Sequence, residues 1–528
     1  MRVFILRYTL FIYFILGLVF NSRSQKYSSS NVLIPVGYVS LEDIYRDEQV
    51  KGLIELKHSF TIRPLIIESN SNLSSIENGQ YYSKKFFNYK KSQINLLPIN
   101  ILQKYNSHHP YGWNDGPLSF SKGYQYIVSG GFSIQSKRLH LSIRPEFYST
   151  ASENYKTNSS WGQVTNGITK IGYGQSSLRY EIGKHNITAS SQNLWLGPGR
   201  YSSLIMSNNA KGFKYISVGS SIPLKTKIGN FEYFIFSGTL TTLSDQGFEN
   251  KNLKTKFFDG RLRYINGLSI VYAPKFLKGF YFGLNRVFQT YYTNLATTSG
   301  GIFKYAMVLN GLFKTKYNDD KLSRDQLLSL YTRWVMPKER AEIYFEYGYN
   351  DAKSNTRDLI LDNSHASASI LGVRKFFKIN HNNDILLEAE ATRMAQTPSY
   401  LQRSAGNWYT HGEVNQGYTN NNQIMGAGSG LGNNLQTFSM SWTRNWNKLG
   451  IQFQRINQNP GQFFGNANNL FIRDVLWNDY SFGIIGRCRL RNIYFNGSIE
   501  SVKSKNYLWI KGSDVNNIYF NLSSIIPL

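Results

Sequence analysis

The feature that most constrains this chain is a two-residue periodicity that continues from about residue 125 to its end. Short segments such as Ala341–Asn350 and Leu435–Trp446 alternate apolar with polar side chains, and turns separate them. This period is typical of β-strands, whose successive side chains point to opposite faces of the sheet. One face carries large aromatic residues and the other carries Ser, Thr, Glu and Asn, as the wall of a membrane barrel requires. The apolar faces of the two segments hold Ala341, Ile343, Phe345, Tyr347 and Tyr349, and Phe438, Met440, Trp442 and Trp446.

An export signal favours the barrel over a soluble sheet with the same alternation. Met1–Ser24 begins with the basic residues Arg2 and Arg7, continues with an apolar run, and ends in a small-x-small sequence typical of a cleavage site. The apolar run Tyr8–Phe20 has 13 residues, whereas a helix needs roughly 20 to span a bilayer. We therefore expect cleavage after residue 24, with an uncleaved anchor helix as the alternative. Later apolar stretches are shorter or interrupted, so the rest of the chain is expected to be either soluble or a barrel.

Composition also favours a barrel. Aromatic residues make up 15% of the chain, which suits the aromatic girdles of a membrane barrel. The mean hydropathy of −0.36 is compatible with this fold, because only every second strand residue faces lipid. The one cysteine, Cys488, excludes an internal disulfide and is expected to be a small buried side chain.

The chain is strongly basic, with a formal charge of +27 that becomes +24 when Arg2, Arg7 and Arg23 of the signal are removed. This charge is explained either by lysine-rich solvated loops or by attraction to anions, namely outer-membrane lipid phosphates, lipopolysaccharide or an acidic polysaccharide. Both explanations stay open. A nucleic-acid partner is not expected for an exported protein without a recognisable nucleic-acid-binding module.

The region before the strands has a different pattern. Val39–Leu56 has roughly helical spacing of apolar residues, and its acidic residues cluster early, where the positive end of a helix dipole favours them. We expect residues 25–120 to form a small α-rich periplasmic or plug region and residues 121–528 to form the barrel. At about 22 residues per strand and connection, roughly 400 residues correspond to roughly 16 to 20 strands, and bacterial barrels have even numbers.

Charged residues fall on the polar faces or at the ends of the predicted strands. Unpaired charges are costly away from water, so these side chains are expected to pair across the lumen or to line a wet cavity. Two carboxylate pairs, Glu342 with Glu346 and Glu388 with Glu390, lie on single strand faces. Same-face positions two apart, as Glu388 and Glu390 are, lie about 6 to 7 Å from one another, a separation that glycosidases use. A glycan hydrolase is therefore one alternative, although such pairs also arise wherever a barrel interior is polar. The full set is Arg144, Glu146, Glu342, Glu346, Glu388, Glu390, Arg393 and Arg455.

Several unusual clusters stand between the predicted strands. They are Pro110–Gly116, Asn193–Arg200, Ser207–Ala210, Trp408–Gly412, Gln416–Asn420 and Gly426–Gly432. Shorter elements accompany them at Arg144–Phe147, Glu342-x-Tyr344-x-Glu346, Asn350–Asp351, Asp358–Leu359, His365 and Gly372-x-x-Lys375. In this order, over roughly residues 40 to 520, the chain resembles the Wzi capsule-assembly family of outer-membrane proteins.

The resemblance implies an all-β transmembrane protein, an antiparallel outer-membrane barrel of about 18 strands with periplasmic helices and a lumen closed by its own loops. It also implies a lectin that holds capsular polysaccharide or another exopolysaccharide at the cell surface without catalysis. Two departures from the family pattern are visible. The chain ends Ile526-Pro527-Leu528, where many such barrels end on an aromatic residue, and it has Trp195-Leu196 where relatives often have two tryptophans.

Four of the clusters are candidate contacts for a glycan. Aromatic faces stack on the C–H faces of sugar rings while neighbouring polar groups bond the hydroxyls; an interfacial girdle or a packed lumen plug is the competing explanation. Pro198, between two glycines, forces a tight turn that holds Trp195 and Arg200 in a fixed relation. The candidate polysaccharide-binding residues are Trp408, Tyr409, His411, Tyr418, Trp195, Arg200, Trp113 and Asp115.

No cofactor or metal is expected. His108 and His109, with His140 or His365, lack a further ligand at a defined spacing, and Gly426–Gly432 lacks the strand–helix unit of a dinucleotide site. The leading hypothesis is a monomeric outer-membrane lectin whose partners are a surface polysaccharide, membrane lipid and the polysaccharide export machinery. An uptake channel, which needs a continuous wet lumen, is the second hypothesis, and an enzyme is the third.

Overall fold

The computed structural model describes residues 31–68, 84–89, 92–151, 167–242, 262–297, 305, 307–310, 324–350, 366–396, 407–460 and 475–528. The expected export signal, residues 1–24, lies outside the described residues. So do four residues of the family motifs, Asp351, Asp358, Leu359 and His365.

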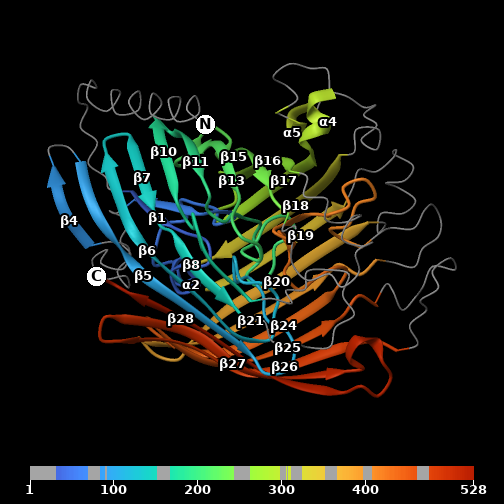
Figure 1. Ribbon diagram of the computed structural model, residues 1–528. Coiled ribbons are helices and arrows are strands. Elements are labelled where there is room, and N and C mark those ends of the chain that lie inside the picture. Colours follow the sequence, from blue (N-terminus) through green and yellow to red (C-terminus); the bar gives the residue numbers. More distant parts are fainter. Residues whose placement is uncertain are drawn as a thin grey trace.

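The wall is a closed antiparallel β-barrel of 18 strands (Figure 1), which confirms the expected fold class. Its hydrogen-bonded sheet has 22 segments. Three wall strands are each interrupted and therefore count as two segments, namely β7 with β8, β9 with β10 and β13 with β14. The segment β4 pairs only with β5 and is not counted as a wall strand, so the 22 segments form 18 strands. The segments are β4 (Lys84–Tyr89), β5 (Ser92–Asn106), β6 (Gly123–Ser136), β7 (Leu139–Ile143), β8 (Glu146–Thr150), β9 (Ile168–Gly172), β10 (Ser177–Ile182), β11 (His185–Ser190), β13 (Lys214–Ser220), β14 (Leu224–Lys225), β15 (Gly229–Leu240), β16 (Arg263–Pro274), β17 (Phe280–Tyr291), β18 (Asp325–Met336), β19 (Ala341–Asn350), β20 (Ser367–Lys378), β21 (Asn383–Arg393), β24 (Asn434–Arg444), β25 (Asn447–Asn457), β26 (Asn478–Leu490), β27 (Ile493–Lys505) and β28 (Val515–Ile526).

The last wall strand closes the barrel on the first. β28 pairs with β5 from Tyr519 opposite Asn106 to Ile526 opposite Ile99, and β4 continues along β5 beyond the point where β28 ends. Because β5 is part of this seam, the wall begins at Ser92, before the boundary at residue 121 that the sequence suggested. The stretch expected to be α-rich contains one helix, α2 (Val39–Lys51), among its described residues.

The two faces of the wall have opposite chemistry, as the alternation predicts. In β19, Ile343 and Phe345 are 46% and 40% exposed, whereas Glu342 and Tyr344 are buried. In β24 the same contrast separates an outer apolar row from an inner row of Ser and Thr. Apolar side chains therefore face the membrane and polar ones face the lumen, which reverses the arrangement of a soluble sheet.

A few residues depart from the expected faces. Trp446 is buried, because β24 ends at Arg444 and the following turn directs the indole inward, where its ring lies 4.5 Å from that of Tyr494. Arg393 and Arg455 lie on the outward face of β21 and β25, where the expectation placed them inside. Cys488 is exposed rather than buried, because β26 presents it outward.

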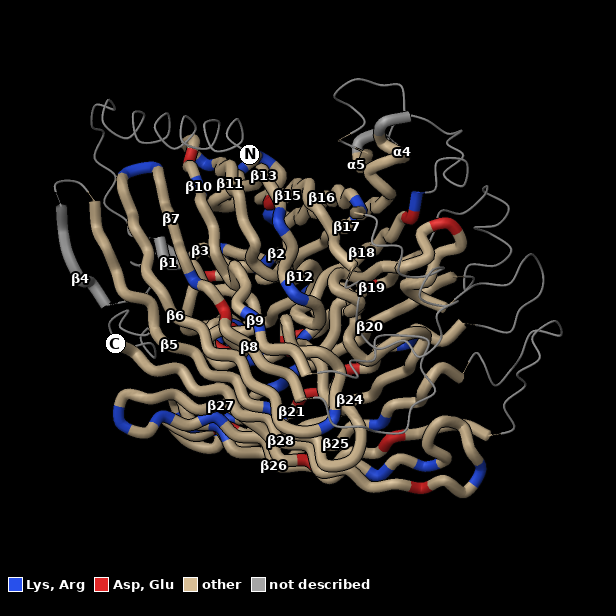
Figure 2. The backbone as a smooth tube through the Cα atoms, in the orientation of Figure 1, with Lys and Arg blue, Asp and Glu red and all other residues tan. Residues whose placement is uncertain are grey.

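Short and long connections alternate along the wall. The turns between β6 and β7, β10 and β11, β18 and β19, β20 and β21, β24 and β25, and β26 and β27 have two to four residues and lie at one end of the barrel. Lys and Arg occupy several of these turns, among them Lys137 and Arg138 (Figure 2). The long connections therefore belong to the opposite end.

Segments outside the wall fill the lumen, and we call residues 31–68, 107–122, 191–213 and 407–433 the luminal plug. Most of their side chains are buried, and the largest apolar cluster of the described chain combines them with inward residues of the wall. Short pairings order the plug. Its elements are β1 (Asn31–Ile34) with β3 (Leu65–Glu68), β2 (Ile62–Arg63) with β12 (Trp195–Leu196), and β22 (Thr419–Asn420) with β23 (Gln423–Ile424).

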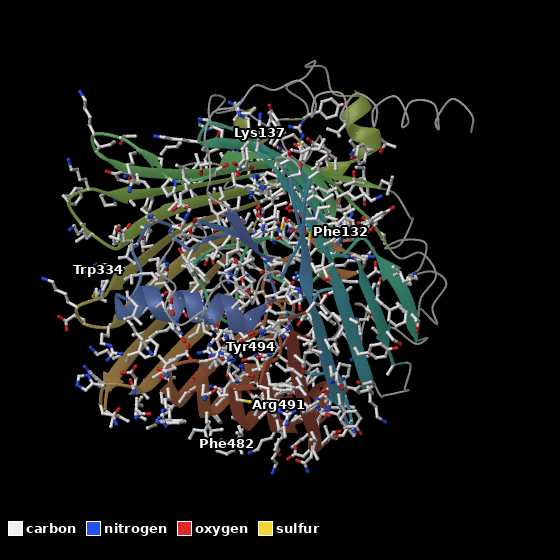
Figure 3. All side chains as sticks on the ribbon, turned by 90° about the vertical axis from the view of Figure 1, so that its left-hand side faces the viewer. Phe132, Lys137, Trp334, Phe482, Arg491 and Tyr494 are labelled. Carbon is white, nitrogen blue, oxygen red and sulfur yellow. The ribbon has the colours of Figure 1, made fainter. Side chains whose placement is uncertain are left out.

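Helix α2 crosses the interior of the barrel (Figure 3, which looks in from the end with the short turns). Ser40 to Val50 are all buried, although this stretch includes Glu42, Asp43, Arg46, Asp47 and Glu48. The helix ends at Lys51 because Gly52 adopts a left-handed conformation with φ of +72°. A helix buried on every side needs polar partners from the wall, and these partners define the site described below.

Three further short helices in the described part of the chain lie between wall strands, namely α4 (Tyr292–Thr297), α5 (Met307–Asn310) and η5 (Tyr507–Trp509). No helix among the described residues is long and apolar enough to cross a membrane.

Candidate functional site

Buried ion pairs hold α2 against the wall. Arg46 donates from Nε to Glu342 Oε1 at 2.9 Å, and Arg333 donates from Nε to the same oxygen at 3.0 Å. All three side chains are at most 1% exposed. Arg46 also donates from Nη2 to the carbonyl of Pro198 at 2.8 Å. One arginine of the helix therefore links the wall to the loop of residues 191–213.

Asp47 links the helix to two more wall strands. It accepts hydrogen bonds from Arg374 of β20 at 2.6 Å and from Arg487 of β26 at 3.2 Å. Arg374 also donates to Glu388 at 2.7 Å, and Lys448 donates to Glu388 at 2.7 Å. The expectation that inner-face charges pair across the lumen is met for Glu342, which binds Arg46 of the luminal helix. Glu388 instead pairs along the wall, because Arg374 lies opposite it on the neighbouring strand β20 and Lys448 comes from β25.

The other members of the two expected carboxylate pairs, Glu346 and Glu390, hold the loop of residues 191–213. Glu390 accepts the backbone N–H groups of Arg200 at 2.6 Å and Tyr201 at 3.1 Å, and Glu346 accepts that of Leu204 at 3.3 Å. The guanidinium of Arg200 donates to Asp43 of α2 at 2.7 Å. Burial opposes the charged form, but Asp43 and its neighbours raise the pKa of Arg200 above its usual value.

Trp195 lies in the same loop and is 4% exposed. It stands opposite Arg63 in the β2–β12 pairing, and the guanidinium of Arg63 lies 4.3 Å from the centroid of a Trp195 ring. Gly197 then adopts a φ of +142° in the turn that leads to Arg200. Trp195 and Arg200 line one small cavity together with residues of α2, so this turn does bring them together.

Trp408, Tyr409 and Tyr418 form a packed aromatic group, and each is 0% exposed. Trp408 donates from Nε1 to the carbonyl of Ala366 at 3.1 Å, and the hydroxyl of Tyr409 donates to the carbonyl of Leu204 at 2.9 Å. The rings of Tyr409 and Tyr418 stack with centroids 6.0 Å apart. The structure thus places the three rings inside the packed plug, where no ring face is open to a sugar.

His411 belongs to the same loop but serves a local turn. Its Nδ1 accepts the backbone N–H groups of Glu413 at 3.2 Å and Val414 at 3.1 Å. The side chain is partly buried. These bonds assign His411 a role in shaping the turn.

Trp113, Asp115 and Arg200 line one cavity between the plug and the wall, which we call the central cavity. Asp115 forms an ion pair with Lys104, whose Nζ also donates to the carbonyl of Gly112 at 3.0 Å. Trp113 donates from Nε1 to the carbonyl of Tyr201 at 3.3 Å and is partly exposed. The remaining polar lining includes Asp43, Asn100, Glu146, Gln175, Asn208, Lys448, Gln452, Gln454, Asn496, Ser498, Glu500, Asn521 and Ser523.

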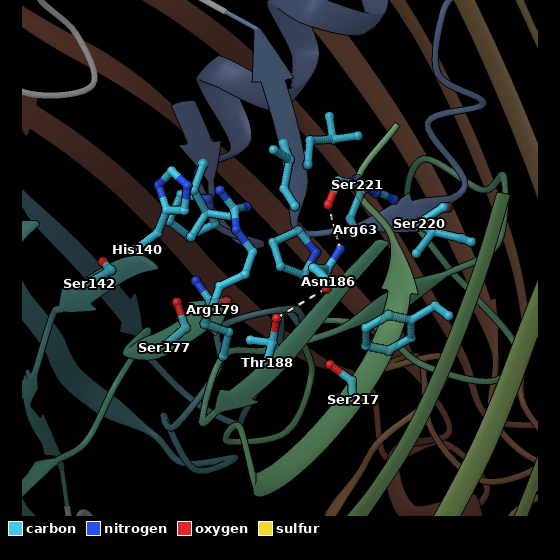
Figure 4. Close-up of a pocket in the computed structure, with 18 of the residues that line it drawn as sticks. Arg63, His140, Ser142, Ser177, Arg179, Asn186, Thr188, Ser217, Ser220 and Ser221 are labelled. Atoms are coloured by element: carbon cyan, nitrogen blue, oxygen red, sulfur yellow. Dashed lines mark hydrogen bonds between the residues drawn. The ribbon is translucent and has the colours of Figure 1, made fainter. Parts of the chain in front are cut away.

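A second cavity lies between β2 and the wall strands from β6 to β15 (Figure 4), and we call it the arginine cavity. Arg63, Arg144 and Arg179 line it, with Glu232 as the carboxylate of the lining. The sequence pattern indicated Arg144 as an inner-face charge, but not the cavity that it lines together with Arg63 and Arg179. The signal was present, because the inward positions of β10, β11 and β13 are polar in succession. These positions are Ser177, Arg179, Asn186, Thr188 and Ser217.

Within the described ranges, no group of three or more His, Cys, Asp or Glu side chains is arranged to hold a metal ion. His108 and His109 face each other with Nδ1 atoms 3.2 Å apart, and Nε2 of His109 lies 3.1 Å from the hydroxyl of Ser504.

The wall, its lipid-facing apolar rows and its polar, filled lumen define a transmembrane β-barrel of the outer-membrane type. A family model described as capsule assembly protein Wzi matches residues 104–476, so the chain belongs to the Wzi capsule assembly family. The resemblance seen in the sequence is thereby confirmed.

One solved structure agrees on the fold. The Escherichia coli outer-membrane protein Wzi, described as a carbohydrate-binding β-barrel involved in group 1 capsule assembly, superimposes with a TM-score of 0.63 at 11% identity. The alignment covers 94% of this chain and 99% of that one. Pseudomonas aeruginosa OccD3 and OprD align over 85% of this chain and 93% and 96% of theirs, at 9% and 7% identity, but with TM-scores of 0.41 and 0.39. No curated protein sequence matches the chain significantly.

Proposed function

We propose that this protein is a non-enzymatic outer-membrane lectin that anchors or organises capsular polysaccharide or another exopolysaccharide at the cell surface. The family match over residues 104–476 carries the proposal. The structurally similar Escherichia coli protein is described as carbohydrate-binding, which supports the same assignment. Export through a cleaved signal at residues 1–24 is part of the proposal, because an outer-membrane barrel must cross the inner membrane first.

The partners of the carboxylate pairs support a non-enzymatic role. A glycosidase acid and its partner must reach the scissile bond. In this chain Glu342 and Glu388 are held by buried arginine and lysine side chains, and Glu390 binds the backbone of the plug. Because these carboxylates are buried and already paired, a structural role in the polar interior is favoured over catalysis.

The plug also argues against the channel alternative. Continuous conduction needs a wet path along the lumen, whereas α2 crosses the interior and its residues Arg46 and Asp47 form ion pairs with β19, β20 and β26. Breaking such buried pairs costs several kcal/mol each, which makes spontaneous opening of this path rare.

The central cavity is the glycan contact we favour among the residues expected from the sequence. It combines a partly exposed indole, Trp113, with polar groups that include Asp115 and Arg200. An aromatic face flanked by hydrogen-bonding groups suits a sugar ring. A direct contact between the polysaccharide and Trp408, Tyr409 or Tyr418 would require the plug to move. His411 and Trp195 would contribute indirectly, by holding the loops of the plug in place.

Short turns face the periplasm in bacterial barrels, so we assign the end with the long connections to the cell exterior. A long polymer held there can rely on many weak contacts, because linked sites raise the effective concentration. The basic surface would add salt-sensitive attraction for an acidic capsule. We propose that the protein acts as a monomer, in contact with membrane lipopolysaccharide and close to the export machinery.

Deletion of the gene tests the proposal. Anchoring predicts that cell-attached polysaccharide falls and the amount in the medium rises, while the total is preserved. A fall in total output would instead indicate synthesis or export. Purified protein is expected to retain the host polysaccharide at low ionic strength, and conductance steps in planar bilayers would favour the channel.

A further inference from the structure

We propose that the arginine cavity binds an anionic sugar, with guanidinium groups on its carboxylate or phosphate and wall hydroxyls and amides on its ring. The inference rests on the proposed carbohydrate-binding function and specifies the class of sugar. It concerns a site distinct from the central cavity, with a different set of lining residues.

The first observation is the position of three buried arginines around one space. Arg63 comes from the plug, whereas Arg144 and Arg179 come from the wall, and they are 5%, 3% and 6% exposed. Arginine presents a planar fork of donors that fits a carboxylate or phosphate in two parallel hydrogen bonds. Because the three arginines come from separate segments and meet at one cavity, their arrangement indicates a binding site for an anion.

The second observation is that these arginines keep unused donors. Arg63 gives Nη1 to Glu42 at 3.0 Å, and Arg179 gives Nη2 to Glu181 at 3.2 Å. Yet Nε and Nη2 of Arg63, Nη1 of Arg144 and Nε of Arg179 are buried without a hydrogen-bond partner among the described residues. A buried donor without a partner costs about 1–3 kcal/mol, and more for a charged group. An anion in the cavity would offset that cost.

Burial also disfavours the charged form of Arg63. It lowers the pKa of this guanidinium to about 10, although Glu42 opposes the shift. The ring of Trp195 and that of Phe60, 4.8 Å away, flank the group. An additional anion beside Arg63 would stabilise its charged form.

The remaining lining suits the hydroxyls of a sugar. Asn186 donates to Ser221 at 3.2 Å and accepts from Thr188 at 3.2 Å, whereas Oγ of Ser217 has no partner in the described part of the chain. Figure 4 shows these groups along one side of the cavity, with His140 and Arg179 on another. Such a row of small donors and acceptors can exchange bonds with several hydroxyls.

The location indicates the route of access. Residues of the lining such as Gln135, His140 and Asn186 stand within a few positions of the short turns after β6 and β10. This half of a bacterial barrel faces the periplasm. The same chemistry occurs in an acidic unit of a surface polysaccharide and in a phosphorylated sugar of lipopolysaccharide, and the experiment separates the two.

The test uses the full-length protein in detergent and two matched pairs of probes. One pair is trigalacturonic acid and its fully methyl-esterified form, and the other is N-acetylglucosamine 1-phosphate and N-acetylglucosamine. Titration calorimetry at low ionic strength should show at least about tenfold tighter binding of the charged member in one pair or both. A preference within the first pair alone indicates the polysaccharide, and one within the second alone indicates the phosphorylated sugar.

Variants connect the preference to the cavity. Arg144→Gln and Arg179→Gln should each reduce the binding of the charged probe at least about tenfold and leave that of the neutral probe unchanged. Arg179→Lys should restore part of it, because the charge returns without the fork. Arg138→Gln is the matched control, since this exposed arginine lies in the turn beside the cavity and removes the same charge. Native electrophoretic mobility with and without heating verifies that each variant is folded.

Two results would overturn the inference. One is equal binding of the charged and neutral members of both pairs, and the other is an equal loss in Arg138→Gln, which would mean general attraction by the basic protein. Neither affects the proposed function, which depends on shedding of polysaccharide in the deletion strain. Conversely, a deletion strain that sheds no polysaccharide would contradict the proposed function but would leave the binding preference measured by calorimetry unaffected.

Discussion

Arg46 of α2 and Glu342 of β19 form an ion pair in the middle of the barrel, with side chains 1% and 0% exposed. The same carboxylate accepts from Arg333, and the arginine also donates to the carbonyl of Pro198. This single contact therefore joins the N-terminal helix, two wall strands and the loop of residues 191–213.

The first prediction concerns this contact. Glu342→Gln leaves Arg46 and Arg333 buried without their anion, so it should lower the free energy of unfolding by about 3–5 kcal/mol. Urea titration of the detergent-solubilised protein, followed by tryptophan fluorescence, measures the change. Glu55→Gln is the control, because its pair with Lys57 is exposed and contributes little. Equal stability of the two variants would show that the helix is not held in this way.

The second prediction concerns Gly372, which stands opposite Tyr344 in the pairing of β19 with β20. A Cβ at Gly372 would lie 2.1 Å from Cζ of Tyr344, whose ring supports the guanidinium of Arg46 and whose hydroxyl donates to Glu390 at 2.8 Å. Gly372→Ala should therefore displace the ring and destabilise the protein by about 1–3 kcal/mol. Gly486→Ala in β26, where the nearest atom would be 3.7 Å away, should be nearly neutral in the same urea titration. If both alanines are tolerated alike, the ring does not need this space.

The third prediction concerns pH. Burial lowers the pKa of His109 to about 3, with a contribution from His108, whereas the unfolded chain has a value near 6.5. Between these values the unfolded state binds more protons, so this residue makes stability fall as the pH drops below about 6.5. His109→Gln should remove up to about 4 kcal/mol of this loss between pH 7 and pH 3.

Urea titrations at several pH values compare the slopes of the two proteins, since carboxylates titrate in both. His381→Gln, in an exposed turn, is the control for the loss of a histidine side chain. A slope for His109→Gln as steep as that of the wild type would contradict the assignment.

The sequence predicts the wall well, because each strand residue must face either lipid or lumen and the alternation follows directly. It predicts helical spacing over residues 39–56, of which residues 39–51 are helical, but it does not predict the place of this helix inside the lumen. A helix at a surface carries an apolar stripe, whereas α2 is buried on all sides and finds its partners in Glu342, Arg374 and Arg487, hundreds of residues away. Such long-range pairs have no local signal.

The candidate site shows the same limit. Trp and Tyr are enriched both at glycan contacts and in packed interiors, so the cluster from Trp408 to Tyr418 supports two interpretations at the level of sequence. Burial of the rings in the structure favours packing in the interior over contact with a glycan. The arginine cavity was missed for the opposite reason, because Arg63 and Arg179 stand in unremarkable local patterns and converge only when the plug meets the wall.

The fourth prediction separates packing from glycan contact at Trp408. Trp408→Ala should destabilise the plug by about 3–5 kcal/mol through the cavity it leaves, and polysaccharide retention should fall only as far as folded protein is lost. Trp408→Phe keeps an aromatic face and loses the hydrogen bond to Ala366, so it should cost about 1–2 kcal/mol and leave retention unchanged. Trp113→Phe and Trp113→Ala give the matched comparison in the central cavity, where the alanine should reduce retention by more than its loss of folded protein explains. Retention is measured as cell-attached against shed polysaccharide in complemented deletion strains, and stability by urea titration. Loss of retention in a stably folded Trp408→Phe protein would restore the aromatic loop as the glycan contact, because packing would be intact while binding was gone.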